Sequence, residues 1–274
     1  MNGHDDPVRS TPVNEPTTVL CDLDGVVWLG GEPIPGSVEA VARLRDAGHR
    51  VLFVTNSSWP LLSEHEAALA AIGIAAPGDV VSSPMAAATL VRAGERVLVA
   101  GGPGIIEAVE RAGAVAFAGD DEGAVAAGVD AVVVGLHREF DYRRLTLATT
   151  AVRSGARFVA TNNDPLYPTP KGPVPGGGSI VAAVATASGR QPAIAGKPFA
   201  PMADAVRRLV GESTNLLMVG DMLSTDGRFA IELGCPFALV RTGNTAPDED
   251  VDFPRAIDVA DLASVAELIV TEHS

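Results

Sequence analysis

Short apolar runs alternate with amphipathic segments along most of this chain, and that alternation restricts the fold more than any other feature of the sequence. The runs have the length and β-branched content of buried strands, and they lie at residues 17–21, 51–54, 96–100, 131–134, 157–160, 193–195, 216–219 and 236–240. Helical spacing of apolar residues predicts helices at residues 37–47, 64–72, 84–92, 105–112, 142–154, 179–188, 199–210, 224–233 and 261–269. Such alternation predicts an α/β fold with a parallel, doubly wound, Rossmann-like sheet.

The first apolar run leads directly into two acidic residues. The segment Thr17–Leu29 reads TTVLCDLDGVVWL, so Asp22 and Asp24 follow the end of an expected strand. In a parallel sheet, ligands bind beyond the carboxyl ends of the strands. Two carboxylates this close repel each other unless a cation or a proton lies between them. We therefore expect a divalent-cation site with one carboxylate free to attack, and a solvated acidic turn is the plain alternative.

Three more polar clusters stand at the carboxyl ends of expected strands, namely Thr55 with Asn56, Lys197, and Asp221 with Asp226. Taken singly, each has a structural explanation, a helix N-cap for the hydroxyl and acidic residues and a surface position for the lysine. Together at one sheet edge they suit phosphoryl transfer. One carboxylate can attack phosphorus, a second can donate a proton to the leaving oxygen, and a hydroxyl, a lysine and a bound cation can hold the phosphate.

Four segments built on these residues resemble the four motifs of the haloacid dehalogenase superfamily of phosphatases, in order and in spacing. They are Asp22-Leu23-Asp24-Gly25-Val26-Val27-Trp28, Thr55-Asn56-Ser57, Gly196-Lys197-Pro198 and Gly220-Asp221 through Thr225-Asp226. Too few residues separate the first two motifs to hold a cap domain, whereas the second and third are far enough apart. This layout resembles the subfamily that includes p-nitrophenyl phosphatase, phosphoglycolate phosphatase, pyridoxal phosphatase and the NagD-type bacterial phosphatases.

The resemblance implies roles for the three acidic residues nearest the reaction. Asp22 would be the nucleophile that becomes an aspartyl-phosphate, and Asp24 would be the general acid/base. The side chains of Asp22 and Asp221, with the backbone carbonyl of Asp24, would bind Mg²⁺. Departures from the family's common residues occur at Met222, at Gly227 and in Ser57-Ser58-Trp59. None of these departures removes a catalytic group.

The same resemblance implies a phosphate-binding set. Thr55 and the backbone of Asn56 would bind the phosphate, and Lys197 would steady both the phosphate and the nucleophile. Asp226 would lie further out and orient Lys197 or a water on the metal.

The resemblance also divides the chain into parts. Residues 16–94 and 191–274 would form a discontinuous Rossmann-like catalytic core, and residues 95–190 an inserted α/β cap domain. Residues 1–15 are polar and acidic, and we expect a disordered arm. The segment Gly101-Gly102-Pro103-Gly104 lacks the spacing of a dinucleotide-binding fingerprint and is interpreted as a turn between a strand and a helix.

A long loop at residues 161–179 holds five prolines and four glycines. A loop of this length without secondary structure is usually functional or disordered, and its phrases also resemble the subfamily. Asn163, Asp164 and the turn centred on Gly177 would face the active site from the cap and help select the substrate. Lys171 is the one cation in this loop, and we interpret it as a surface lysine.

Composition restricts the partners. The net charge of −14 disfavours nucleic acid, because phosphate backbones need clustered Lys and Arg. No apolar run reaches the length of a membrane span, and the N-terminal residues lack the apolar core of a signal peptide. We expect a soluble cytoplasmic protein in which Cys21 and Cys235 are reduced, buried thiols.

These observations lead us to expect a magnesium-dependent phosphatase of a small phosphorylated metabolite. The alternatives are a phosphomutase, which the position of the cap disfavours, and a catalytically weak phospho-metabolite sensor, which the intact acidic residues disfavour. Phosphoglycolate, glycerol phosphate, pyridoxal phosphate, sugar phosphates and nucleotides all stay open as substrates. The loop at 161–179 has no basic cluster, which disfavours a second large anionic group. The resemblance also implies a homodimer formed through the cap.

Overall fold

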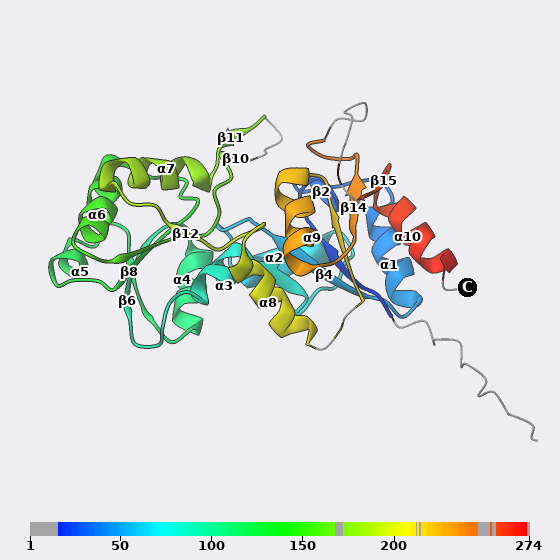
Figure 1. The fold of residues 1–274 in the computed structure, drawn as a ribbon, viewed down its shortest axis with the longest axis horizontal. Helices are drawn as coiled ribbons and strands as arrows, with labels where there is room; N and C mark the ends of the chain where they lie inside the picture. The colour runs from blue at the N-terminus through cyan, green and yellow to red at the C-terminus, as the bar shows by residue number, and fades with distance from the viewer. Residues whose placement is uncertain are drawn as a thin grey trace, which may run out of the picture.

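Two parallel sheets lie side by side along the longest axis of the molecule (Figure 1). The computed structural model describes residues 16–167, 172–211, 213, 215–245, 253 and 256–272 of the 274-residue chain. The expected N-terminal arm at residues 1–15 and Lys171 lie outside the described residues. The α/β class and the parallel, doubly wound arrangement predicted from the sequence are confirmed.

The larger sheet has six parallel strands in the order β15-β14-β13-β1-β4-β5. Its strands are β1 (Thr18–Cys21), β4 (Arg50–Thr55), β5 (Val80–Ser82), β13 (Leu216–Gly220), β14 (Phe237–Val240) and β15 (Ala256–Val259). The chain runs outward from β1 through β4 to β5, and later returns on the other side of β1 at β13. The strand order therefore reverses at β1, and this is where ligands bind in open α/β sheets.

Helices cover both faces of the larger sheet. One face carries α1 (Ser37–Asp46), α2 (Leu62–Ala71) and α10 (Leu262–Glu272), and the other carries α3 (Ser83–Ala88), α8 (Ala200–Val210) and α9 (Arg228–Leu233). Because every residue of β1 is buried between these layers, the strand has no polar face. This explains why it reads as a continuous apolar run rather than an alternating one.

The smaller sheet has five parallel strands in the order β12-β9-β8-β6-β7. Its strands are β6 (Arg96–Ala100), β7 (Val115–Ala118), β8 (Ala131–Val134), β9 (Arg157–Ala160) and β12 (Ala193–Ile194). Its helices are α4 (Pro103–Arg111), α5 (Glu122–Ala126), α6 (Tyr142–Arg153) and α7 (Gly177–Ser188). The side chain of Asp141 accepts a hydrogen bond from the backbone N–H of Arg144 and caps α6, as its position in the sequence predicts.

The two sheets share one hydrophobic cluster. Helices α3, α4 and α8 lie between them (Figure 1), and the buried cluster there includes Val54 of β4 together with Val99 of β6. A separate cluster fills the far face of the smaller sheet under α6 and α7. The packing is therefore continuous from one sheet to the other on the side of α3, α4 and α8.

Several expected elements differ from the structure. The expectation that residues 161–179 lack secondary structure is wrong, because β10 (Leu166–Tyr167) and β11 (Val174–Pro175) pair there as an antiparallel ribbon. The expected helix at 224–233 begins as a π-helical turn, η1 (Leu223–Gly227). The strands β5, β7 and β15 and the helix α5 are not expected from the sequence, and neither is the short ribbon of β2 (Trp28–Leu29) and β3 (Glu32–Pro33). These elements are short or partly exposed, so no buried run marks them.

The glycine-rich segment after β6 is a turn between a strand and a helix, as predicted. Gly104 at the start of α4 donates its backbone N–H to the carbonyl of Trp59 at 3.1 Å. A Cβ on Gly102 would lie 2.7 Å from the Trp59 ring, and one on Gly104 would collide with the carbonyl oxygen of Pro60. The glycines therefore serve close packing against the loop that follows β4.

Two further expectations concern cysteines and membranes. Cys21 and Cys235 are both free thiols, but Cys235 is only partly buried. No helix among the described residues combines the length and the apolar composition needed to cross a membrane.

Candidate active site

Three adjacent strands of the larger sheet end at one cavity. Because β4, β1 and β13 are neighbours, Thr55, Asp22 and Asp221 come together at their carboxyl ends. The cavity has a volume of about 440 Å³, and the expected site residues in its lining are Asp22, Asp24, Thr55, Asn56, Asp164, Gly177, Lys197 and Asp221. Two expected residues do not line it, since Asp226 is wholly buried and Asn163 is exposed.

Lys197 is a buried cation held between two carboxylates. Its side chain is 2% exposed, and its Nζ lies 2.7 Å from an oxygen of Asp22 and 2.7 Å from an oxygen of Asp226. The second oxygen of Asp226 accepts the backbone N–H of Met222 at 3.2 Å. Burial alone would lower the pKa of Lys197, but the two carboxylates raise it above its ordinary value. The lysine is therefore charged, and Asp226 fixes its position.

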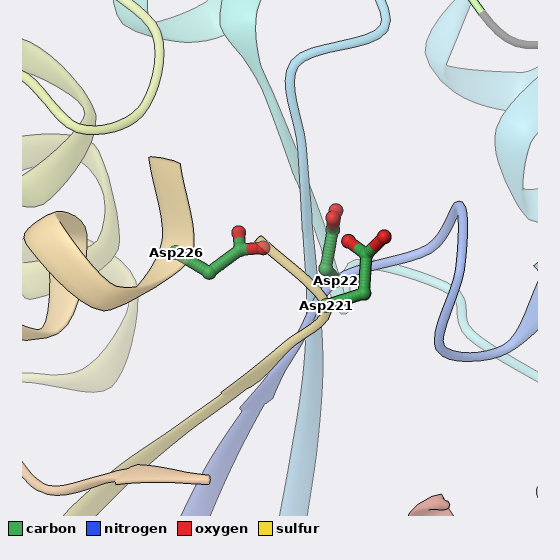
Figure 2. Close-up of side chains that lie close together, drawn as sticks. All are labelled: Asp22, Asp221 and Asp226. Atoms are coloured by element: carbon green, nitrogen blue, oxygen red, sulfur yellow. The ribbon is translucent and has the colours of Figure 1, made fainter. Parts of the chain in front are cut away.

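Negative charge exceeds positive charge at this site. Asp22, Asp221 and Asp226 each place a carboxylate oxygen within 4.8 Å of the other two, and Figure 2 shows Asp22 and Asp221 beside each other with Asp226 reaching in from η1. Burial raises the pKa of Asp22 well above its ordinary value, although Lys197 opposes the increase. Burial, with the charge of Asp226, raises the pKa of Asp221 to about 6. A divalent cation would relieve this repulsion.

The side-chain atoms that could bind a metal ion here are all carboxylate oxygens, and Mg²⁺ prefers oxygen ligands. Asp22 and Asp221 each place a carboxylate oxygen within 4.8 Å of the other, and Figure 2 shows the two carboxylates beside each other. The oxygens of Asp226 already accept bonds from Lys197 and Met222, so this residue suits an outer position better than direct coordination. The residues present therefore fit a bound magnesium ion.

Asp24 lies in the same cavity and is oriented by a neighbour on its own turn. Its Oδ1 accepts the indole N–H of Trp28 at 3.1 Å. Burial raises the pKa of Asp24, and the bond from Trp28 opposes the increase. A carboxyl group with a raised pKa can carry the proton that a leaving oxygen needs.

The side chain of Asn56 has a role that sequence reasoning missed. Its Oδ1 accepts the backbone N–H of Lys197 at 2.8 Å, and its Nδ2 donates to the carbonyl of Lys197 at 3.1 Å. The same Nδ2 donates to Asp164 at 3.0 Å. Thr55, one residue earlier, accepts the backbone N–H of Ser57 through its Oγ1 at 3.0 Å. Asn56 thus links the second motif to the third and to the loop from the smaller sheet.

The smaller sheet contributes one wall of the cavity. Asn162 donates to the backbone carbonyl of Asn56 at 2.7 Å, and burial raises the pKa of Asp164. Gly177 begins α7, where a Cβ would lie 3.0 Å from the backbone nitrogen of Leu136. Apolar or aromatic side chains complete this wall and were not singled out from the sequence, namely Leu136, Leu166, Tyr167 and Pro173.

A fifth polar cluster follows β14 and was also missed. Asn244 donates both its backbone N–H and its side-chain N–H to Asp221, and Thr245 Oγ1 donates to the backbone carbonyl of Asp221 at 2.6 Å. The signal was present, because Arg-Thr-Gly-Asn-Thr follows the expected strand at 236–240 just as the other clusters follow theirs.

Comparison with known proteins finds two matching family models. A haloacid dehalogenase-like hydrolase model matches residues 19–115, and a HAD-hydrolase-like model matches residues 194–268. The 5'-nucleotidase YutF of Bacillus subtilis is 34% identical over 85% of this chain and 90% of its own length. The D-glycerol 3-phosphate phosphatase of Mycobacterium tuberculosis is 40% identical over 84% of this chain, which spans 64% of that relative.

One solved structure is similar in both fold and sequence. The glycerol phosphate phosphatase of Mycobacterium tuberculosis, crystallised with magnesium, matches with a TM-score of 0.82 and 36% identity, over 93% of this chain and 79% of its own.

Proposed function

This chain belongs to the haloacid dehalogenase-like hydrolases, and we propose that it is a magnesium-dependent phosphatase of a small phosphomonoester. The observation that carries the proposal is the position of Lys197, whose Nζ lies 2.7 Å from Asp22 in a cavity that Asp24 also lines. This arrangement places a nucleophile, an acid and a fixed cation around one volume of about 440 Å³.

The reaction follows from the chemistry of these side chains. A carboxylate oxygen of Asp22 forms a bond to phosphorus as the bond from phosphorus to the leaving oxygen breaks. Asp24 donates its proton to that oxygen, then takes a proton from the water that hydrolyses the aspartyl-phosphate. Lys197 and the hydroxyl and backbone groups at Thr55 and Asn56 hold the phosphate oxygens, on which negative charge develops.

The metal would be held by the side chains of Asp22 and Asp221 and by the carbonyl of Asp24. When bound there, magnesium would supply positive charge that offsets the phosphate oxygens. Asp226 keeps Lys197 in place without binding the ion itself, because both of its oxygens already accept hydrogen bonds.

The lining of the cavity supports a small substrate with an uncharged leaving group. Lys197 is the cation among the described residues that line the cavity, and it already faces two carboxylates. The described residues of the wall from the smaller sheet are largely apolar and include no basic side chain that could pair with a second anionic group. We propose a small polyol phosphate such as glycerol phosphate as the first candidate, in keeping with the M. tuberculosis relative.

Phosphate release from a panel of phosphomonoesters, with and without Mg²⁺, tests this function. We expect wild-type turnover that requires the metal and that is lost in Asp22→Asn. Asp141→Asn, which alters an exposed helix cap away from the cavity, is the matched control and should keep wild-type activity. Turnover that survives in Asp22→Asn would contradict the covalent mechanism, and well-folded wild type that binds esters without turnover would favour a sensor.

Two organisational proposals accompany the function. We propose that residues 95–190 form the inserted cap, with β12 added because it pairs with β9, and that the remaining described residues form the core.

We also propose that the protein dimerises through the cap. Light scattering after size exclusion tests this, and a monomer at micromolar concentration would contradict it. A cytoplasmic location and the absence of a nucleic-acid partner stay predictions.

A further inference from the structure

Among the described residues, the hydrogen bonds to the carboxylate of Asp221 reach one of its two oxygens. Its Oδ2 accepts the backbone N–H of Asn244 at 2.5 Å and the side-chain Nδ2–H of the same residue at 2.8 Å. Two donors on one carboxylate oxygen occupy the lone pairs that face them. Asp221 is 2% exposed, so water does not replace these bonds.

The same oxygen is also enclosed sterically. A Cβ on Gly25, where φ is +89°, would lie 2.5 Å from Oδ2, and a Cβ on Gly243 would collide with it. Thr242 Oγ1 donates to the carbonyl of Gly25 at 2.6 Å, which ties these two close-packed segments together. No room is left for a cation beside Oδ2, so Oδ1 is the oxygen that can bind one. Figure 2 shows the carboxylate of Asp221 beside that of Asp22.

We propose that Asn244 is a positioning residue that makes the site selective for Mg²⁺ over Ca²⁺, by restricting Asp221 to coordination through a single oxygen. Mg²⁺ takes six ligands in near-octahedral geometry at short distances, and a single oxygen of a carboxylate fills one of these positions without distorting the others. Ca²⁺ takes up to eight ligands and often binds both oxygens of a carboxylate. A carboxylate that cannot rotate to offer its second oxygen therefore disfavours Ca²⁺. This inference rests on the metal site of the proposed function.

Calorimetric titration of the full chain with Mg²⁺ and separately with Ca²⁺, without substrate, tests the proposal. We expect wild type to bind Mg²⁺ more tightly than Ca²⁺. In Asn244→Ala and in Asn244→Leu, which keeps the side-chain size, we expect the ratio of the two dissociation constants to shift toward Ca²⁺ by about tenfold, the lower end of the effect of residues behind metal ligands.

Two control variants test whether the change in the ratio of dissociation constants arises at Asn244 and Asp221. Asn215→Ala removes a side-chain amide at the opposite end of β13, where Nδ2 donates to Thr17 Oγ1 at 3.0 Å, and should keep the wild-type ratio. Asp221→Ala should abolish binding of both ions and so assigns the measured heat to this site. Melting temperatures in EDTA establish that each variant is folded.

Different results would contradict the metal site and the role of Asn244. Wild type that binds neither ion would overturn the proposed metal site itself. Wild type without a preference for Mg²⁺, or folded Asn244 variants with the wild-type ratio, would overturn only the role of Asn244. If both variants fail to fold, a crystal structure of wild type with Ca²⁺ decides, and coordination by both oxygens of Asp221 would overturn the proposal.

Discussion

At the scale of single residues, Lys197 shows how burial changes the contribution of an ion pair to the stability of the fold. An exposed pair contributes little because water screens it, whereas a buried charge that loses its partner is strongly unfavourable. Lys197 is 2% exposed and offsets both Asp22 and Asp226. Its removal would leave one buried carboxylate, Asp226, and one partly buried carboxylate, Asp22, without a counterion among the described residues.

We therefore predict that Lys197→Met lowers the free energy of unfolding by about 3–5 kcal/mol in the absence of metal, as measured by urea titration in EDTA. Arg45→Met is the matched control, because Arg45 pairs with Asp79 at 3.4 Å with both side chains partly exposed. That variant should lose less than about 1 kcal/mol. Equal losses in the two variants would show that burial does not strengthen the Lys197 pairs.

His65 predicts a pH dependence of stability. Its side chain is 5% exposed, and its Nε2 has no hydrogen-bond partner among the described residues. Burial lowers the pKa of His65 below its ordinary value of 6.5, although Glu64 and a backbone bond to Ser57 oppose the decrease. Below pH 6.5 the unfolded chain takes up a proton before the folded one does. The stabilisation is therefore complete above pH 6.5 and declines as the pH falls toward the lower folded-state pKa.

The measurement is the free energy of unfolding of wild type and of His65→Gln at several pH values between 5 and 8. We expect the wild type to lose stability relative to the variant as the pH falls, since carboxylates common to both cancel in the difference. A difference that does not change with pH would contradict a lowered pKa for His65.

At the scale of elements, the start of α4 holds the loop that carries the second motif. Gly104 at this helix contacts Trp59 and Pro60, which follow Thr55 and its neighbours by only a few residues. The packing is close enough that any Cβ on Gly104 must displace the carbonyl of Pro60. An element of the smaller sheet thereby supports a catalytic loop of the larger one.

Gly104→Ala should therefore lower the free energy of unfolding by about 1–3 kcal/mol, the usual cost of overpacking, and should also lower the rate of phosphate release. Gly123→Ala, in the first turn of α5, is the control and should be close to neutral, because the gain in helix propensity opposes a slight displacement of the capping Asp121 Oδ1, which lies 3.3 Å from the new Cβ. Loss of stability in Gly104→Ala with unchanged kinetics would separate this contact from the active site.

At the scale of the whole molecule, the shared hydrophobic cluster predicts how the protein unfolds. Met202 of α8 is fully buried and belongs to the cluster that contains residues of both sheets. If the two sheets depend on the same core, neither is expected to persist after the other unfolds. Tryptophan fluorescence and far-ultraviolet circular dichroism should therefore report one coincident transition in urea.

Met202→Ala should move that transition in both signals together and lower the stability by about 2–5 kcal/mol. The comparison needs only the two spectroscopic signals on the same samples. Two separate transitions in wild type, or a variant in which only one signal moves, would show that the sheets unfold independently.

The longer buried strands can be predicted from the sequence alone. β6, β8 and β9 have the predicted bounds because a buried strand of a parallel sheet is a continuous apolar run. The polar residues that follow such runs could also be predicted, and Asp22, Thr55 and Asp221 do lie at one edge of the larger sheet. The expectation that Lys197 follows a strand of the same sheet is wrong, because β12 pairs with β9 in the smaller sheet. Local periodicity and strand ends are properties of neighbouring residues, so they appear in the chain directly.

The distant residues that complete the site become apparent from the folded chain. The bonds from Asn56 to Asp164 and from Asn244 to Asp221 join separate segments of the chain. β7 and β15 were not predicted, because both are edge strands whose partly exposed residues do not form a continuous apolar run. Contacts between remote segments depend on strand order and packing, and no periodicity or local propensity encodes which strand becomes the neighbour of which.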